Sequence, residues 1–147
     1  MRTDTPQTTY LKDYKAPDYI PQHLDLTFDI QDGKTLVKSV CTYKAAGDGA
    51  KPLALDGEEL KLISCKLNGE AFQPVATDNS LTIDTPGTEF TLEIVTEIEP
   101  EKNTRLEGLY KSTDTYCTQC EAEGFRRITY YQDRPDVMVP MTVRIEA

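Results

Sequence analysis

The segment F-T-L-E-I-V-T-E-I, from Phe90 to Ile98, has the clearest strand pattern in the chain. Its apolar and polar side chains alternate with a period of two, which places them on opposite faces of an extended backbone. One face carries Phe90, Leu92, Ile94 and Ile98, and the other carries Thr91, Glu93, Val95 and Glu97. This pattern predicts a strand that buries one face and exposes the other, so it favours an all-β fold.

Three further segments repeat the alternation, two of them before this strand in the sequence and one after it. Residues His23 to Ile30 alternate, and the turn residues Asp32-Gly33 separate them from the β-branched segment Thr35 to Tyr43, which predicts a hairpin. At the other end of the chain, one face of a last strand is predicted to carry Val137, Val139, Met141, Val143 and Ile145.

Shorter strands lie between these segments. Leu53 to Leu55 and Leu81 to Ile83 are short apolar runs next to turn residues. Lys61 to Leu67 is a longer strand, and Asn68-Gly69 after it is a signal for a type I′ hairpin turn. One face of that strand is expected to carry Ile63, Cys65 and Leu67.

The chain has 147 residues, the size of one domain that buries a core of its own. Several short strands separated by turns, with no amphipathic helix, predict an antiparallel all-β sandwich or saddle. Residues 1–20 have no periodicity and are expected to form an extended arm, and residues 21–147 the β-rich domain. The polar stretch from Pro100 to Pro135 is expected to be a long irregular loop, of the kind that is often functional.

Charge and cysteine usage restrict the partners and the compartment. The chain has 25 acidic and 16 basic residues and a net charge of -9, which disfavours nucleic acid and anionic lipid surfaces as partners. No apolar run approaches the ~20 residues of a membrane-spanning helix, and the first residues do not resemble a signal peptide. The four cysteines are too few and too scattered for a disulfide scaffold, so we expect them to be reduced in a cytoplasmic protein.

The chain has a single histidine, His23. Zinc enzymes commonly use two or three histidine ligands, and histidine is the most frequent general base. We therefore expect that this chain cannot carry most standard hydrolytic sites unaided. Cys117 and Cys120 form a C-x-x-C pair that could hold a metal or act as a redox dithiol, but the expected reading is two small thiols that pack under a loop.

The segment Tyr116 to Asp136 concentrates an amide, carboxylates, arginines and tyrosines in one polar region. Such a set can bind a small charged ligand, because carboxylates in a cleft hold an ammonium group and an amide orients its neighbour. The alternative is a loop whose charges pair with one another, and composition alone favours that alternative. The residues concerned are Tyr116, Gln119, Glu121, Glu123, Arg126, Arg127, Tyr130 and Tyr131.

Three runs in this region resemble the N-terminal domain of the bacterial aminopeptidase N branch of the zinc metallopeptidases. They are Leu106-Glu-Gly-Leu-Tyr-Lys-Ser112, Cys117-Thr-Gln-Cys-Glu-Ala-Glu-Gly-Phe-Arg126 and Ile128-Thr-Tyr-Tyr-Gln-Asp-Arg-Pro-Asp-Val137. Further similarity lies in Asp13-Tyr-Lys-Ala-Pro-Asp-Tyr19, Asp25-Leu-Thr-Phe28 and Leu55-Asp-Gly-Glu-Glu-Leu-Lys-Leu62, so the resemblance covers most of the chain.

The resemblance implies a β-rich saddle whose Thr-Gln-x-Glu loop reaches into the active site of a catalytic domain of the same chain. Glu121 would anchor the free α-amino group of a peptide substrate, and Gln119 would line the first specificity pocket. Glu123 and Arg126 match the flanks of the motif and would have a scaffolding role.

The family's zinc-binding H-E-x-x-H helix and its Gly-x-Met-Glu-Asn motif are absent from this sequence. The resemblance therefore implies zinc in a full-length parent aminopeptidase, none in this chain, and no hydrolysis by this chain alone. The alternative is a free-standing β-sandwich protein-interaction module.

Overall fold

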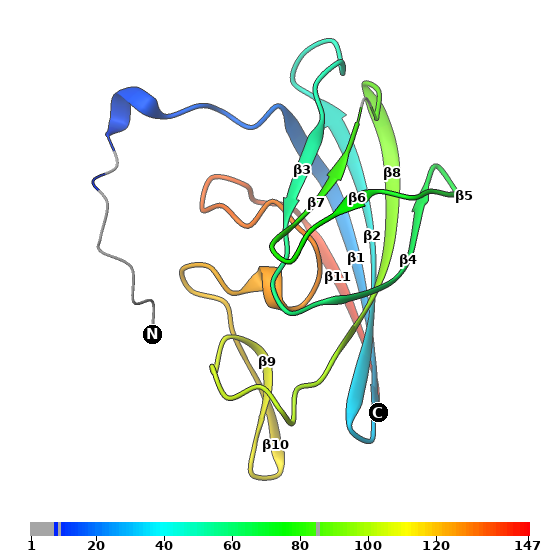
Figure 1. The fold of residues 1–147 in the computed structure, drawn as a ribbon, viewed down its shortest axis with the longest axis vertical. Coiled ribbons are helices and arrows are strands. Elements are labelled where there is room, and N and C mark those ends of the chain that lie inside the picture. Colours follow the sequence, from blue (N-terminus) through cyan, green and yellow to red (C-terminus); the bar gives the residue numbers. More distant parts are fainter. Residues whose placement is uncertain (1–7, 9, 85) are drawn as a thin grey trace.

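A six-stranded sheet forms one layer of the molecule, and a three-stranded sheet packs against part of one of its faces (Figure 1). The structure is a computed structural model, and it describes residues 8, 10–84 and 86–147. The strands are β1 (Tyr19–Gln31), β2 (Lys34–Ala45), β3 (Leu53–Asp56), β4 (Lys61–Leu67), β5 (Glu70–Ala71), β6 (Val75–Ala76), β7 (Ser80–Ile83), β8 (Glu89–Ile98), β9 (Gly108–Ser112), β10 (Thr115–Gln119) and β11 (Met141–Glu146). Two 3-10 turns are η1 (Leu11–Asp13) and η2 (Phe125–Arg127).

The large sheet has the order β11-β1-β2-β8-β4-β5, and the small sheet has the order β3-β7-β6. Both hairpins that the turn residues predict are present: β1 pairs with β2 across Gly33, and β4 pairs with β5 across Asn68-Gly69. Asn68 and Gly69 both have positive φ angles, 52° and 85°, as the type I′ turn requires. These observations confirm the all-β fold class.

The strand predicted over Phe90 to Ile98 is β8, and it is central in the large sheet. β8 lies between β2 and β4, and the four apolar side chains of its predicted inner face, Phe90, Leu92, Ile94 and Ile98, are all buried. Thr96 on the same face is fully buried too. Its hydroxyl donates a hydrogen bond of 3.1 Å to the carbonyl of Ile128, which offsets the cost of burying a polar group.

The core lies between the inner face of the large sheet and a second layer. That layer consists of the small sheet and the segment that follows η2 (Figure 1). The stacked rings of Tyr43 and Phe90, with centroids 5.3 Å apart, close one end of the core. From the second layer the core takes Leu53, Leu55, Leu81, Ile83, Ile128, Tyr130 and Tyr131.

One predicted face is wrong in β4. The register of β4 against β8 shifts between Leu62 and Ser64, so Ile63 is an extra residue in a β-bulge. Ile63 is 48% exposed, whereas Leu62 packs against the core in its place. The period-two pattern placed Ile63 beside Cys65 because a bulge changes the phase of the strand without leaving a signal in the apolar pattern.

The stretch from Pro100 to Pro135 is not an irregular loop throughout, as the sequence predicted. β9 and β10 form an antiparallel hairpin, and η2 follows it. After η2 the chain enters the core, where residues 127–132 are all buried. The polar composition hid these elements because the hairpin is largely solvent-exposed and the buried residues include Arg127, Thr129 and Gln132.

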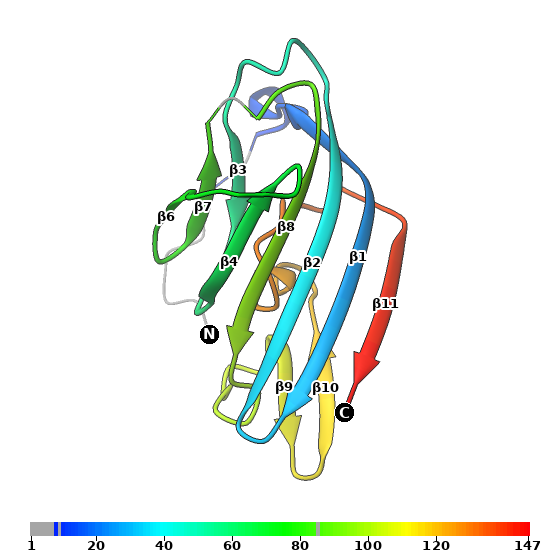
Figure 2. The same ribbon diagram turned by 90° about the vertical axis from the view of Figure 1, so that its right-hand side faces the viewer.

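β11 departs from the predicted antiparallel arrangement, since it pairs with β1 in parallel. The chain crosses from the β10 end of the molecule to the far edge of the large sheet before it enters β11, and a parallel pair requires such a crossover (Figure 2). Met141, Val143 and Ile145 are in register with Leu24, Leu26 and Phe28 of β1, so they lie on the inner face of the sheet. Each of the three is nevertheless about half exposed or more.

Within the described part of the arm, Tyr10 to Asp18 lie outside both sheets and include η1, and β1 begins at Tyr19. Residues 1–7 and 9, which belong to the predicted arm, lie outside the described residues. The arm is attached to the segment after η2, because Arg134 donates to the carbonyl of Lys15 and the Tyr14 hydroxyl donates to Asp136. In the described chain no helix is long and apolar enough to cross a membrane.

Candidate functional site

Gln119 and Glu121 lie where the β9–β10 hairpin ends and the chain turns towards η2. Gln119 is the last residue of β10 and pairs with Gly108 of β9. Its side-chain amide donates a hydrogen bond of 3.3 Å to the carbonyl of Glu121, and both residues are exposed. The Glu121–Ala122 peptide bond is cis. Gln119 ends β10 directly before the turn Cys120 to Gly124, which carries Glu121, so the structure brings the two predicted site residues together.

Close packing under the turn requires two glycines. A Cβ atom on Gly124 would lie 2.6 Å from the carbonyl oxygen of Gln119 and 2.9 Å from the Cα of Cys120, both backbone atoms. A Cβ atom on Gly108 would lie 2.8 Å from the Cβ of Arg127, and Gly108 also has a φ angle of 72°. The hairpin and the turn therefore approach η2 more closely than any residue with a side chain permits.

Glu121 borders an open polar hollow of about 500 Å³. Four carboxylates face a single arginine around it. The lining residues are Glu58, Asn79, Arg105, Glu107, Glu121, Ala122 and Glu123. Among the described residues, no hydrogen bond or ion pair holds the Glu121 carboxylate, and only its backbone carbonyl is engaged. This arrangement favours a cationic group over an anionic one.

Arg126, by contrast, is held on several sides. Its Nε atom lies 2.9 Å from Asp133 Oδ2, its Nη2 atom donates 3.0 Å to the carbonyl of Asp133, and Nη2 lies 3.5 Å from Glu123. Burial alone would lower the pKa of Arg126, but the hydrogen bond to Asp133 and the charge of Asp56 raise that pKa above its ordinary value. Arg126 therefore stays charged and acts as a fixed tie.

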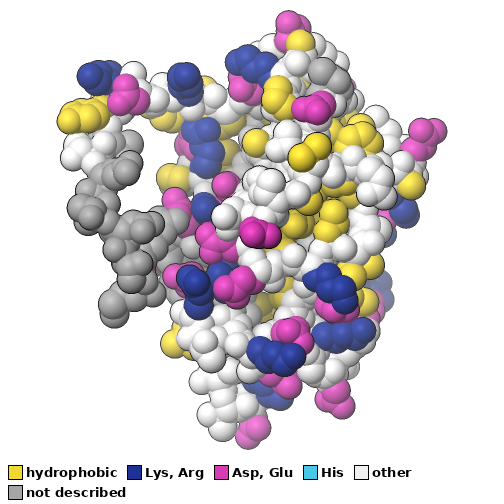
Figure 3. Space-filling model, in the orientation of Figure 1, with side chains coloured by type: hydrophobic (Ala, Val, Ile, Leu, Met, Phe, Trp, Pro, Cys, Tyr) yellow, Lys and Arg dark blue, Asp and Glu magenta, His cyan; other side chains and the backbone are white. Residues whose placement is uncertain are grey.

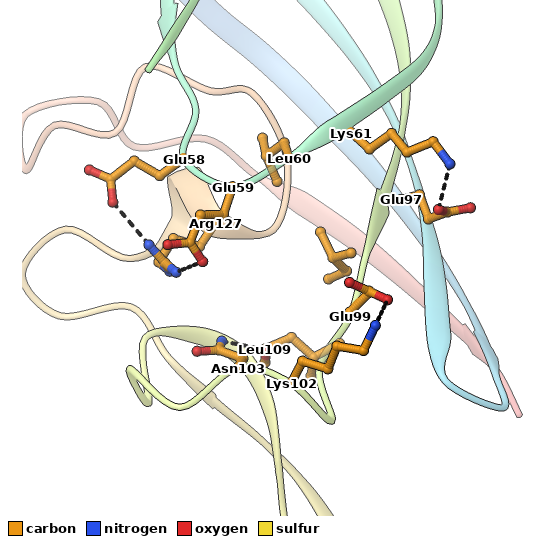
Figure 4. A pocket seen from close by; sticks show the side chains of 11 residues that line it. Glu58, Glu59, Leu60, Lys61, Glu97, Glu99, Lys102, Asn103, Leu109 and Arg127 are labelled. Atoms are coloured by element: carbon orange, nitrogen blue, oxygen red, sulfur yellow. Dashed lines mark hydrogen bonds and ion pairs between the residues drawn. The ribbon is translucent and has the colours of Figure 1, made fainter. Parts of the chain in front are cut away.

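Arg127 is almost fully buried, and its guanidinium faces Glu58 and Glu59 (Figure 4). Its guanidinium donates 3.1 Å to Glu58 and also pairs with Glu59, both in the β3–β4 connection. It borders a second hollow of about 330 Å³, at which Lys61 pairs with Glu97 and Lys102 with Glu99. Across the face seen in Figure 3, acidic and basic side chains likewise lie next to one another.

The segment Tyr116 to Asp136 was expected either to bind a small charged ligand or to pair its charges internally, and each interpretation holds for part of it. The charges of Arg126, Arg127 and Asp133 pair within the molecule, as the composition favoured, whereas the Glu121 carboxylate has no such partner in the described chain. Tyr130 and Tyr131, which the sequence placed in a ligand-binding set, are buried in the core instead. Sequence reasoning did not find the lining residues Glu58, Arg105 and Glu107, because the fold brings them in from other segments.

The cysteines and the histidine do not form a metal centre in the described residues. All four cysteines are free, and no group of three or more His, Cys, Asp or Glu side chains there is arranged to hold a metal ion. Burial raises the pKa of Cys41 to about 12 and that of Cys65 to about 11. Burial also raises the pKa of Cys120, with a further contribution from the charge of Asp133. These shifts oppose the thiolate form that metal binding and redox exchange use.

His23 lies on the outer face of β1. There its Nε2 atom is 3.1 Å from both Asp25 Oδ1 and Thr142 Oγ1. Within the described residues, no third His, Cys, Asp or Glu side chain joins His23 and Asp25 in a group that could hold a metal ion.

The family assignment follows from comparison with known proteins. The sequence profile of the peptidase M1 N-terminal domain matches residues 20–147. The chain belongs to the peptidase M1 N-terminal domain family. This M1 N-terminal domain is 49% identical to Aminopeptidase N of Escherichia coli (strain K12) over 99% of its own length and 17% of that protein. It is 42% identical to Aminopeptidase N of Caulobacter vibrioides over 100% of its own length and 17% of that protein.

Solved structures agree with the assignment. The M1 N-terminal domain superposes on Legionella pneumophila aminopeptidase A in complex with aspartic acid with a TM-score of 0.83 and 31% identity, over 93% of this chain and 17% of that one. An M1 zinc metallopeptidase from Deinococcus radiodurans has the same fold, with a TM-score of 0.75 and 19% identity, over 88% of this chain and 32% of that one.

This M1 N-terminal domain thus spans about a sixth of the length of the curated relatives. Because the match is to one domain of much longer proteins, the comparisons favour the M1 N-terminal domain over the free-standing interaction module.

Proposed function

We propose that this domain holds the free α-amino group of peptide substrates in a longer zinc-dependent aminopeptidase. Glu121 is the anchor for the substrate ammonium, and Gln119 lines the adjacent specificity pocket. The zinc ion and the groups that cleave the peptide bond belong to the catalytic domain of the same longer chain, so this domain alone is inactive.

The observation that carries the proposal is the contrast between Glu121 and its neighbours. Its carboxylate is exposed and has no partner in the described chain, while Arg126, Asp133 and Arg127 next to it are all paired. A carboxylate that is left unpaired at the tip of a tightly packed turn is available for a ligand cation. A charge-assisted hydrogen bond to an ammonium group is among the stronger polar contacts that a protein makes.

The position of such an anchor also explains why an aminopeptidase would use it. A fixed carboxylate that binds the terminal ammonium sets how far the first residue of the substrate extends, and so which peptide bond reaches the catalytic groups. Gln119 suits the adjacent position, because its side chain already contacts the backbone of Glu121 and is exposed at the end of β10, next to the turn.

We further propose that the inner face of β11 contacts the catalytic domain of the longer protein. Met141, Val143 and Ile145 continue the apolar inner face of the large sheet, yet the second layer does not extend far enough to cover them. Exposed apolar side chains that continue a core are typical of a surface that another domain covers. The proposal includes a cytoplasmic location, which the free state of all four cysteines supports and cell fractionation tests.

The test is the kinetics of Glu121→Ala in the full-length enzyme. Because hydrogen bonds to charged groups contribute about 1.5–3 kcal/mol, we expect kcat/KM for a peptide to fall by about tenfold or more. Asp114→Asn, at the far end of the same hairpin, removes one negative charge without touching the turn and serves as the matched control. Wild-type kinetics in Glu121→Ala would remove the anchor assignment.

A further inference from the structure

We propose that Arg126 is the positioning residue for Glu121, acting through its ion pairs with Glu123 on the turn and with Asp133 on the body of the domain. The inference rests on the proposed function of Glu121. It makes the scaffolding role expected of Arg126 specific: Arg126 touches no substrate and yet determines how well the anchor binds.

Arg126 joins the turn to the chain that follows η2. On the turn side, its Nη2 atom lies 3.5 Å from the Glu123 carboxylate, two residues after Glu121. On the other side, Asp133 Oδ2 accepts a hydrogen bond of 2.9 Å from Arg126 Nε and one of 3.2 Å from the Arg126 backbone N–H. The Arg126 and Asp133 side chains are 14% and 10% exposed, so water screens their attraction only weakly.

Asp133 is in turn fixed to the end of β3. Its backbone N–H donates 3.1 Å to Asp56 Oδ2. Asp56 and Tyr131 exchange two backbone hydrogen bonds, of 2.7 and 3.1 Å, and the Glu58 N–H donates 2.9 Å to the Arg126 carbonyl. The contacts therefore run from the turn through Arg126 and Asp133 to β3, a strand of the core.

Arg127 does not have this role. Its side chain pairs with Glu58 and Glu59, which belong to the β3–β4 connection rather than to the turn. In the described chain, Arg126 is the arginine that forms an ion pair with a side chain of the 120–124 turn, that of Glu123. Without it, the turn keeps its glycine packing but loses the charged tie next to Glu121.

The experiment is a double-mutant cycle in the full-length enzyme with Arg126→Gln, Glu121→Gln and both together. The readout is KM and kcat for L-alanine p-nitroanilide, which has a free α-amino group. A small displacement of a positioned group costs up to about a hundredfold, so we expect KM to rise on the order of tenfold in Arg126→Gln, with a smaller change in kcat. Arg126→Lys, which keeps the charge, recovers part of the loss.

The cycle separates positioning from general damage. If Arg126 acts through Glu121, Arg126→Gln changes KM by less than about twofold once Glu121 is already Gln. Arg134→Gln is the matched control, because Arg134 also pairs with a nearby aspartate, Asp136, but ties the arm instead of the turn. Its KM stays at the wild-type value.

The outcomes distinguish this inference from the proposed function. Wild-type kinetics in Glu121→Gln would overturn the proposed function. An impaired Glu121→Gln together with a wild-type KM in Arg126→Gln would overturn the present inference alone, as would an Arg126→Gln effect of full size in the Glu121→Gln background. If Arg126→Gln does not fold, Asp133→Asn takes its place in the same cycle, since it removes the charged partner and keeps the shape.

Discussion

Gly124 shows how closely the turn that carries Glu121 is packed. The two atoms that a Cβ would meet there, at 2.6 and 2.9 Å, belong to the backbone of Gln119 and Cys120 and cannot rotate away. We expect Gly124→Ala to lower the free energy of unfolding by about 1–3 kcal/mol, the usual cost of overpacking. Chemical denaturation measures this cost.

Gly47→Ala is the control for that substitution. A Cβ on Gly47 has no neighbour within 4 Å, and Gly47 is not among the residues with a positive φ angle. Its free energy of unfolding should stay within about 0.5 kcal/mol of the wild type. Equal effects of the two substitutions would show that the turn is not tightly packed.

At the residue scale, the sequence could predict which side chains to examine but not which are free. Gln119 and Glu121 came from a motif, and the structure places them close together and exposed, Gln119 at the end of β10 and Glu121 on the turn that follows. The pairing of Arg126 with Asp133 could not be predicted, because aspartates and glutamates surround it in the sequence and only the fold selects one. Tyr130 and Tyr131 look like ligand-binding residues in a polar run, yet they contribute to the core.

At the scale of elements, a ladder of charges joins β2, β8 and β4, three strands that lie side by side in the large sheet (Figure 2). Glu93 of β8 lies 3.0 Å from Lys38 of β2 and 2.9 Å from Lys66 of β4. Hydrogen bonds from Lys66 and Lys38 lower the pKa of Glu93 below its ordinary value of 4.5. The ladder therefore ties three neighbouring strands together as long as Glu93 is ionised.

The lowered pKa of Glu93 determines how the stability of the fold depends on pH. A carboxylate whose pKa is lower in the folded than in the unfolded state stabilises the fold above the unfolded value and loses this effect as the pH falls through the folded one. We expect Glu93→Gln to be less stable than the wild type at pH 7, and the gap to narrow as the pH falls below about 4.5. Denaturation at several pH values measures the gap, and a gap that is the same at neutral and acid pH would contradict the ladder.

Elements with a strict alternation were predictable, and the others were not. β2 and β8 follow the period-two pattern over their whole length, and β1 follows it from His23 onwards, after a register shift between Pro21 and His23. The turn between β1 and β2 carries the expected Gly33. The bulge at Ile63 has no signature in the apolar pattern. In the β9–β10 hairpin only Gly108 and Leu109 are buried, so its sequence has no alternating apolar face from which a strand could be inferred.

At the scale of the whole molecule, the large sheet extends beyond the layer that covers it. The side chains of Met141, Val143 and Ile145 on β11 remain exposed on the inner face. If the catalytic domain covers them, Val143→Asp buries a charge in the full-length protein, and we expect it to cost at least about 2 kcal/mol of stability there. In this domain alone the same substitution stays in water and costs little.

Arg144→Ser is the control for this comparison, because Arg144 lies on the opposite face of β11. Thermal unfolding of the full-length protein and of the domain measures both variants. The proposed contact predicts a larger effect of Val143→Asp in the full-length protein, whereas equal effects in the two proteins would place this face in water in both.

The proposed anchor is tested most directly by how strongly the full-length enzyme distinguishes a ligand with an α-ammonium group from one without it. The measurement is the ratio of inhibition constants for alanine amide and propionamide, which differ only in that group, in the wild type and in Glu121→Gln. We predict that the wild type binds alanine amide more tightly and that this preference falls on the order of tenfold in Glu121→Gln. An unchanged preference would contradict the assignment of Glu121 as the anchor.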